Sequence, residues 1–155
     1  MTNDTPSPPP TAQRTGPIHV PLAGPPQVDP PSREIYAAMG QENIFRMLAD
    51  FYTELAQSPV KHLFPPDMLA ASERSAAFFV GLLGGPPLYQ QRYGHPALRA
   101  RHLPFRIDNT AREAWLACFD TILANAPEKY HFPAKHLPGF RTWLHEFSRW
   151  MINTK

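Results

Sequence analysis

Residues 89–105 read Tyr89-Gln-Gln-Arg-Tyr-Gly-His-Pro-Ala-Leu-Arg-Ala-Arg-His-Leu-Pro-Phe105, and this stretch decides the fold of the 155-residue chain. Proline is tolerated in the first turn of a helix and prevents a helix from continuing. Pro96 and Pro104 therefore predict a short helix between them, with His102 near its end. The histidine has two kinds of neighbour along the chain: apolar Leu98, Leu103 and Phe105, and cationic Arg99, Arg101 and Arg106.

A histidine in this setting is typical of a haem site. One imidazole binds iron, apolar side chains enclose the macrocycle, and cations pair with the propionates. A histidine considered alone is more often a surface or hydrogen-bonded residue than a ligand, by roughly five to one. The prediction of an iron ligand therefore rests on the neighbours of His102. The other six histidines form no pair four residues apart, so they indicate no histidine-only zinc site.

Helices are predicted on both sides of this stretch, because apolar residues recur every three or four positions. Ser32 is a plausible N-cap for a short helix that ends at Gly40. No stretch alternates with period two, so we predict an all-α domain, with loops over about 84–95 and 126–138. The four long helices are expected over about 42–57, from Asp67 to Gly84, from Asp108 or Asn109 onward, and over about 137–152.

Proline divides the chain into two parts, since ten of its 20 prolines fall in residues 1–31. That segment has few large apolar side chains to bury, so we predict a disordered Pro-rich extension over 1–31 and a compact domain over 32–155. A polyproline segment that binds a partner is the alternative, and a solvated tail is favoured over it by about four to one. The domain carries 14 Lys and Arg against 11 Asp and Glu, a net charge of +3 that is too small to indicate nucleic-acid binding.

Several classes of protein are excluded at this level. Cys118 is the one cysteine, so no intrachain disulfide and no cysteine-based metal site can form, which suits a reducing, cytoplasmic location. There is no apolar run of about 18 residues and no secretory signal in residues 1–31, so we expect no membrane association. The sequence also lacks the dinucleotide-binding, phosphate-loop, zinc-protease and nucleophile-elbow motifs.

A resemblance to a known family rests on several of these residues together. The stretch 89–105 resembles the signature of truncated haemoglobins, and more narrowly of their group II branch. Gly84-Gly85-Pro86 and Phe51-Tyr52 fit the same pattern, and Trp115, thirteen residues after His102, is a hallmark of group II. The resemblance covers about residues 33–152. It implies a two-over-two helical sandwich, in which two antiparallel helix pairs enclose haem b.

The resemblance also implies a role for eleven side chains around the cofactor. His102 matches the proximal ligand of the iron, and Tyr52 and Trp115 match the two distal hydrogen-bond donors. Arg74 and Tyr89 match positions that bind the propionates in relatives. The remaining implied contacts with the cofactor are Phe64, Ala71, Ser75, Phe78, Arg101 and Phe105.

Two of these positions depart from the family pattern. Ala71 stands where oxygen carriers often have a histidine or another polar residue, so it offers no hydrogen bond and leaves access open. Ser75 stands where relatives often have a large apolar residue or glutamine. The loop 64–67 is about one residue shorter than in some relatives, and a slip of one residue there would exchange these assignments. Without the resemblance, Tyr52 and Trp115 could equally be packing residues of the core.

The implied function is binding of O₂ and other diatomic ligands with slow release. Two charge-assisted hydrogen bonds of roughly 1.5–3 kcal/mol each would slow release by about one to three orders of magnitude. Slow release suits ligand retention, or NO-dioxygenase or peroxidase-like turnover with a reductase, better than diffusive transport. The alternatives are a haem-based gas sensor or binding module that acts through a partner, and a helical interaction domain without a cofactor.

Overall fold

The computed structural model describes residues 17–155, and within that range it contains helices and no strands. The predicted all-α class is therefore confirmed. Two 3₁₀ turns, η2 (Lys61–Leu63) and η3 (Ala134–His136), join the helices. The helices are α1 (Ile35–Ala56), α2 (Met68–Leu82), α3 (Leu88–Tyr93), α4 (Leu98–His102), α5 (Asn109–Leu123), α6 (Ala126–Tyr130) and α7 (Leu137–Met151).

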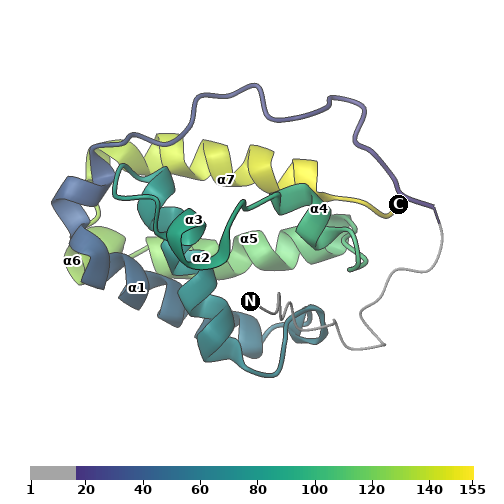
Figure 1. The fold of residues 1–155 in the computed structure, drawn as a ribbon, viewed down its shortest axis with the longest axis horizontal. Helices are drawn as coiled ribbons and strands as arrows, with labels where there is room; N and C mark the ends of the chain where they lie inside the picture. The colour runs from purple at the N-terminus through teal and green to yellow at the C-terminus, as the bar shows by residue number, and fades with distance from the viewer. Residues whose placement is uncertain (1–16) are drawn as a thin grey trace.

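The four long helices pack as two pairs, α1 with α2 and α5 with α7 (Figure 1). Aromatic side chains join the pairs at the centre of the core. The rings of Phe51 on α1 and Phe119 on α5 are stacked with centroids 3.8 Å apart, and Phe79 on α2 lies 6.0 Å from Phe140 on α7. The short helix α4 contacts α7 near the end of this core.

Aspartates begin two of the long helices, as the sequence predicts. The Asp67 carboxylate accepts a hydrogen bond from the Ala70 backbone N–H (3.0 Å) at the start of α2. The Asp108 carboxylate accepts one from the Ala111 N–H (2.8 Å) at the start of α5. Each cap satisfies a backbone donor that has no partner within its own helix.

The boundaries of the shorter helices differ from the prediction. Gly40 does interrupt its helix, with φ 78° and ψ 161°, but α1 resumes after this kink. The stretches predicted as loops contain α3 and α6, because single helical turns are too short to show a period in the sequence. The proximal helix begins at Leu98 rather than Pro96, since Ala97 lies in the left-handed region with φ 42°.

Gly84 brings the end of α2 against the start of α1. Its φ is +109°, and a Cβ built there would overlap the Arg33 carbonyl, whose carbon lies 2.7 Å away. The Tyr36 N–H donates to the Leu83 carbonyl beside it (2.9 Å). A glycine is required here by both the conformation and the space.

Residues 17–31 have neither helix nor strand and lie along α7, reaching the end of the molecule where the C-terminus lies (Figure 1). We call this segment the strap. Arg99 donates to the His19 carbonyl (3.1 Å), and Arg149 donates to the Gly24 carbonyl (3.0 Å). Half of the extension predicted to be disordered is therefore held against the domain, and the rest of it, residues 1–16, lies outside the described residues.

In the described part of the chain, no helix is both long enough and apolar enough to cross a membrane.

Candidate functional site

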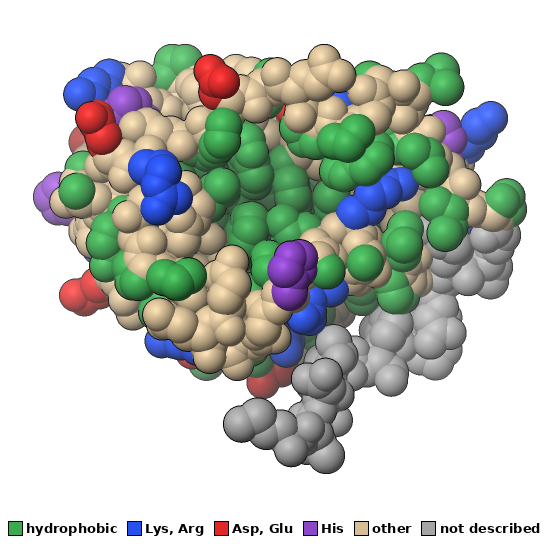
Figure 2. Space-filling view, turned by 45° about the horizontal axis from the view of Figure 1, so that its top comes forward, with side chains coloured by type: hydrophobic (Ala, Val, Ile, Leu, Met, Phe, Trp, Pro, Cys, Tyr) green, Lys and Arg blue, Asp and Glu red, His purple; other side chains and the backbone are tan. Residues whose placement is uncertain are grey.

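One cavity of about 590 Å³ opens between the two helix pairs and α4. Figure 2 shows the face on which it opens, where hydrophobic side chains line the floor and arginine or lysine and histidine side chains lie at the rim. Its volume is that of a typical cofactor site. All eleven side chains predicted to surround the cofactor line it: Tyr52, Phe64, Ala71, Arg74, Ser75, Phe78, Tyr89, Arg101, His102, Phe105 and Trp115.

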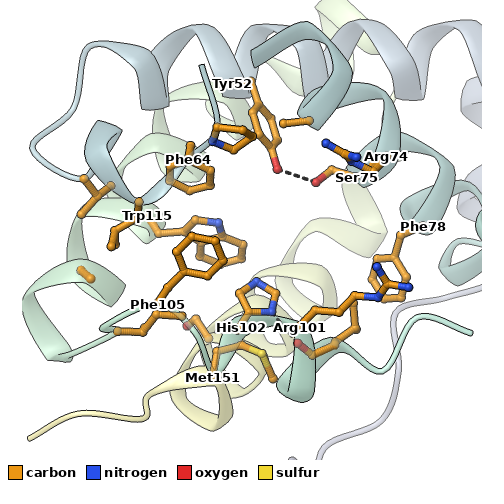
Figure 3. A pocket seen from close by; sticks show the side chains of 18 of the residues that line it. Tyr52, Phe64, Arg74, Ser75, Phe78, Arg101, His102, Phe105, Trp115 and Met151 are labelled. Atoms are coloured by element: carbon orange, nitrogen blue, oxygen red, sulfur yellow. Dashed lines mark hydrogen bonds between the residues drawn. The ribbon is translucent and has the colours of Figure 1, made fainter. Parts of the chain in front are cut away.

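His102 points into the cavity from the last residue of α4 (Figure 3). Its Nδ1 lies 2.5 Å from the Leu98 carbonyl. A carbonyl can only accept a hydrogen bond, so Nδ1 carries the proton and Nε2 keeps a free lone pair. Burial lowers the pKa of His102, against the opposing effect of the Leu98 hydrogen bond. The side chain is therefore a neutral imidazole suited to binding a metal ion.

Tyr52 and Ser75 lie on the opposite side of the cavity (Figure 3). Their hydroxyl oxygens are 2.6 Å apart, and either one can be the donor. Burial raises the pKa of Tyr52, although the hydrogen bond to Ser75 and the charge of Arg74 oppose this. The phenol thus stays protonated and keeps a hydrogen to donate.

Trp115 occupies the wall of the cavity between these two sides. Its ring packs edge-on against Phe51 and Phe119, with centroids 5.7 and 4.8 Å away. Among residues 17–155, no hydrogen bond engages its indole N–H, so this donor is available to a molecule in the cavity.

Two cations line the cavity near Phe78, as Figure 3 shows for Arg74 and Arg101. The Arg101 guanidinium lies over the Tyr89 ring, 5.6 Å from its centroid, and donates to the His95 carbonyl (3.3 Å). These positions can pair with carboxylates of a bound molecule.

The other two arginines near His102 do not line the cavity, which corrects the expectation that they meet the propionates. Arg106 is exposed. Arg99 turns toward the end of α7, where backbone carbonyls attract its guanidinium, and stacks over the Trp150 ring at 4.4 Å. Sequence neighbours therefore point in different directions here, because α4 has only one side facing the cavity.

Several lining residues escaped the sequence analysis. Phe147 and Met151 lie within the last predicted helix, about 137–152, whose apolar periodicity indicates packing and gives no link to a site. No motif or spacing in the sequence indicates that Arg112 and Ser148 belong to the site. They contact each other across α5 and α7, where the Arg112 Nε donates to the Ser148 hydroxyl (3.1 Å).

Comparisons with known proteins agree on one family. The family described as Bacterial-like globin matches residues 34–151. The Group 2 truncated hemoglobin YjbI of Bacillus subtilis is 44% identical over 84 residues, which are 54% of this chain and 64% of that protein. The chain thus spans just under two thirds of the length of this curated relative.

Two solved structures have the same fold. Phosphate-bound Hell's gate globin IV superimposes with a TM-score of 0.74 at 37% identity, covering 83% of this chain and 79% of that one. The truncated oxygen-avid haemoglobin from Bacillus subtilis superimposes with a TM-score of 0.69 at 34% identity, covering 76% of this chain and 98% of the other.

Proposed function

The chain belongs to the bacterial-like globin family, with the fold of the group II truncated haemoglobins, and we propose that it binds O₂ and other diatomic ligands at a haem iron held by His102. Globins of this family bind haem iron, and haem b is the usual form and the cofactor of this chain. The observation that carries the proposal is one neutral imidazole facing two hydrogen-bond donors, Tyr52 and Trp115, across a single apolar cavity.

The residues of the cavity fit this cofactor. His102 supplies a single nitrogen ligand, and the described residues contain no cluster of three or more His, Cys, Asp or Glu that would hold a bare metal ion. Phe64, Phe78 and Phe105 provide apolar walls, while Arg74 and Arg101 match the charge of two propionates. With one protein ligand, haem iron supplies an open position at which a diatomic molecule binds.

The distal side chains would then set how long the ligand stays. A diatomic ligand that gained partial negative charge there would be stabilised by hydrogen-bond donors. The indole N–H of Trp115 is fixed by its aromatic neighbours and donates without a competing acceptor. The Tyr52 phenol is shared with Ser75, so part of its hydrogen-bonding capacity is already used. We infer that Trp115 is the stronger donor.

Absorption spectra test this proposal. Purified protein supplied with haem should give a Soret band at roughly 400–430 nm. Addition of O₂, CO or cyanide should shift the wavelength of this band. His102→Ala should abolish stable haem binding, because no other histidine lines the cavity. His95→Ala, an exposed position seven residues earlier, is the matched control and should keep the iron ligand. A normal five-coordinate ferrous spectrum in His102→Ala would overturn the assignment.

Redox turnover would extend this function and is separable from it. Binding and retention need only the cavity, whereas NO-dioxygenase or peroxidase-like activity needs a supply of electrons from a reductase. Consumption of NO by the oxygenated protein, measured with and without an external electron donor, distinguishes an enzyme from a protein that retains or senses its ligand.

A further inference from the structure

Asn153 is a completely buried polar residue just beyond α7, with an exposed fraction of 0%. Its side-chain Nδ2 donates to the His102 carbonyl (3.1 Å), and its Oδ1 accepts from the Ile107 N–H (3.0 Å). A carbonyl only accepts and an N–H only donates, so these partners fix the orientation of the amide. One side chain thus holds both ends of the loop that follows the iron-binding histidine.

The backbone of Asn153 extends the same network. Its N–H donates to the Ile107 carbonyl (2.9 Å), and its carbonyl accepts from the His19 N–H of the strap (2.9 Å). The strap therefore contacts this residue at its backbone carbonyl. A buried amide with all these bonds made rigidifies its surroundings, and losing one bond leaves an unsatisfied polar group.

Arg99 ties the other end of α4 to the same place. It lies three residues before His102, and its guanidinium donates to the carbonyls of Trp150, Ile152 (3.2 Å) and His19 (3.1 Å). A cation at the carboxyl end of α7 is favourable both for these carbonyls and for the helix dipole. Strap, α4 and the end of α7 are thereby joined through two side chains, Arg99 and Asn153.

The proximal helix needs such support. It has five residues and begins after the left-handed Ala97, and an isolated helix of that length is not stable. The Leu98 carbonyl sets the rotation of the His102 ring within α4, but it does not set the position of α4 itself. That position comes from contacts with α7 and the strap.

We propose that Asn153, hydrogen-bonded by His19 of the strap, is a positioning residue for His102, holding its main chain so that the imidazole meets the iron at a fixed distance and tilt. This inference rests on the proposed function, because it assumes iron at His102. It assigns a role in the haem site to two segments outside the cavity, the strap and the residues after α7.

Asn153→Asp targets the critical bond, since its carboxylate keeps an acceptor for Ile107, loses the donor to the His102 carbonyl and places a buried negative charge against that carbonyl. The readout is the iron–histidine stretching band of the ferrous protein by resonance Raman spectroscopy, which reports on the bond itself rather than on ligand binding. We expect the band to shift or split. Transfer of haem to an excess of apomyoglobin should become roughly tenfold faster, the scale of one hydrogen bond to a buried group.

A matched pair of deletions tests the strap without altering Asn153. Chains beginning at residue 17 and at residue 21 differ in four residues, of which His19 makes the contacts with Asn153 and Arg99. The longer chain should give the band of the full-length protein, and the shorter chain should shift it in the same direction as Asn153→Asp. These deletions remain informative if Asn153→Asp fails to fold.

The outcomes separate this inference from the proposed function. If full-length protein takes up no haem, both are wrong. If it has a normal five-coordinate spectrum but the band is unmoved in Asn153→Asp and in the shorter chain, then His102 binds iron and the network only stabilises the fold. Haem transfer within twofold of wild type in those variants would support the same conclusion.

Discussion

At the scale of single residues, the Ser75 hydroxyl lies 2.6 Å from that of Tyr52. Ser75 therefore competes with a bound ligand for the hydrogen bond of the Tyr52 phenol. We expect Ser75→Ala to slow O₂ release by about threefold or more, because the Tyr52 proton is then free for the ligand and a neutral hydrogen bond is worth about 1 kcal/mol. Stopped-flow measurement of O₂ dissociation tests this. In a Tyr52→Phe background, Ser75→Ala should have no such effect, and an equal effect there would exclude the competition.

Trp115 should dominate the retention of O₂. Trp115→Phe keeps an aromatic ring against Phe51 and Phe119 and deletes the donor. We expect O₂ dissociation to become roughly tenfold faster or more, on the scale of a charge-assisted hydrogen bond. Tyr52→Phe should change the rate less. A dissociation rate for Trp115→Phe within about twofold of wild type, a difference of under half a kcal/mol in activation free energy, would show that Trp115 only packs in the core.

The sequence could predict which side chains share a cavity where a side chain's neighbours along the chain are also its neighbours in space. His102, Arg101 and Phe105 come from one short stretch, and all line the cavity. Arg99 belongs to the same stretch but points away, because the carbonyls that attract it lie at the end of α7, some 50 residues later. Asn153 carried no signal, since its partners are brought to it only by the fold.

At the scale of elements, Gly84 and Gly139 make a matched pair. A methyl group at Gly84 would overlap the Arg33 carbonyl and force a left-handed φ on alanine, so Gly84→Ala should lower the free energy of unfolding by more than about 1 kcal/mol. Gly139 lies within α7, and a Cβ built there would have no atom near it. Gly139→Ala should therefore raise the free energy of unfolding by roughly 0.5–1 kcal/mol. Thermal unfolding of both variants followed by circular dichroism is the measurement. Equal changes would contradict the close approach of α1 and α2.

Element-level prediction succeeded for long helices and failed for single turns. The long helices repeat their apolar stripe over three or more turns, and two of them, α2 and α5, also begin at capping aspartates, so the sequence contains a strong signal for each long helix and a second one for these two. For α6, which has five residues, the structure depends on burial of Tyr130 against the rest of the domain. That burial is a tertiary contact, and no local pattern predicts it.

At the scale of the whole molecule, buried phenols should make the protein sensitive to alkali. Tyr130 donates to the Asp50 carboxylate, and burial together with this negative charge raises the pKa of Tyr130. Burial of Asp50 would raise the pKa of that carboxyl, but the hydrogen bonds from Tyr130 and Lys129 outweigh it, so the pKa is lowered. Burial also raises the pKa of Tyr52.

The sign of the effect follows from the protons bound in each state. Unfolded tyrosines lose their protons near the ordinary pKa of 10.0, while the folded protein keeps them. The unfolded state then binds fewer protons, so the free energy of unfolding is unaffected well below pH 10 and falls above it, by about 1.4 kcal/mol per pH unit for each proton. Urea unfolding between pH 8 and 11 should show this fall. Tyr130→Phe should make it shallower, and an unchanged slope would contradict the role of Tyr130.

The division of the chain into an extension and a domain was predicted from composition. Composition does not account for the contacts that residues 17–31 make with the domain. Residues 17–31 have few apolar side chains to bury and form neither helix nor strand, and Leu22 is fully exposed. The strap is nevertheless held by backbone carbonyls that accept from Arg99 and Arg149. Every residue type has such carbonyls, so a count of residue types cannot reveal these contacts.

Ala71, whose methyl group lines the cavity, has a consequence for how the protein sorts its ligands. A side chain this small does not have to swing aside before a molecule arrives, and its methyl group cannot hold a water molecule by a hydrogen bond. O₂, CO and NO should therefore be captured at similar speeds. The protein would then discriminate among them by their dissociation rates, which the distal hydrogen-bond donors set, rather than by their association rates.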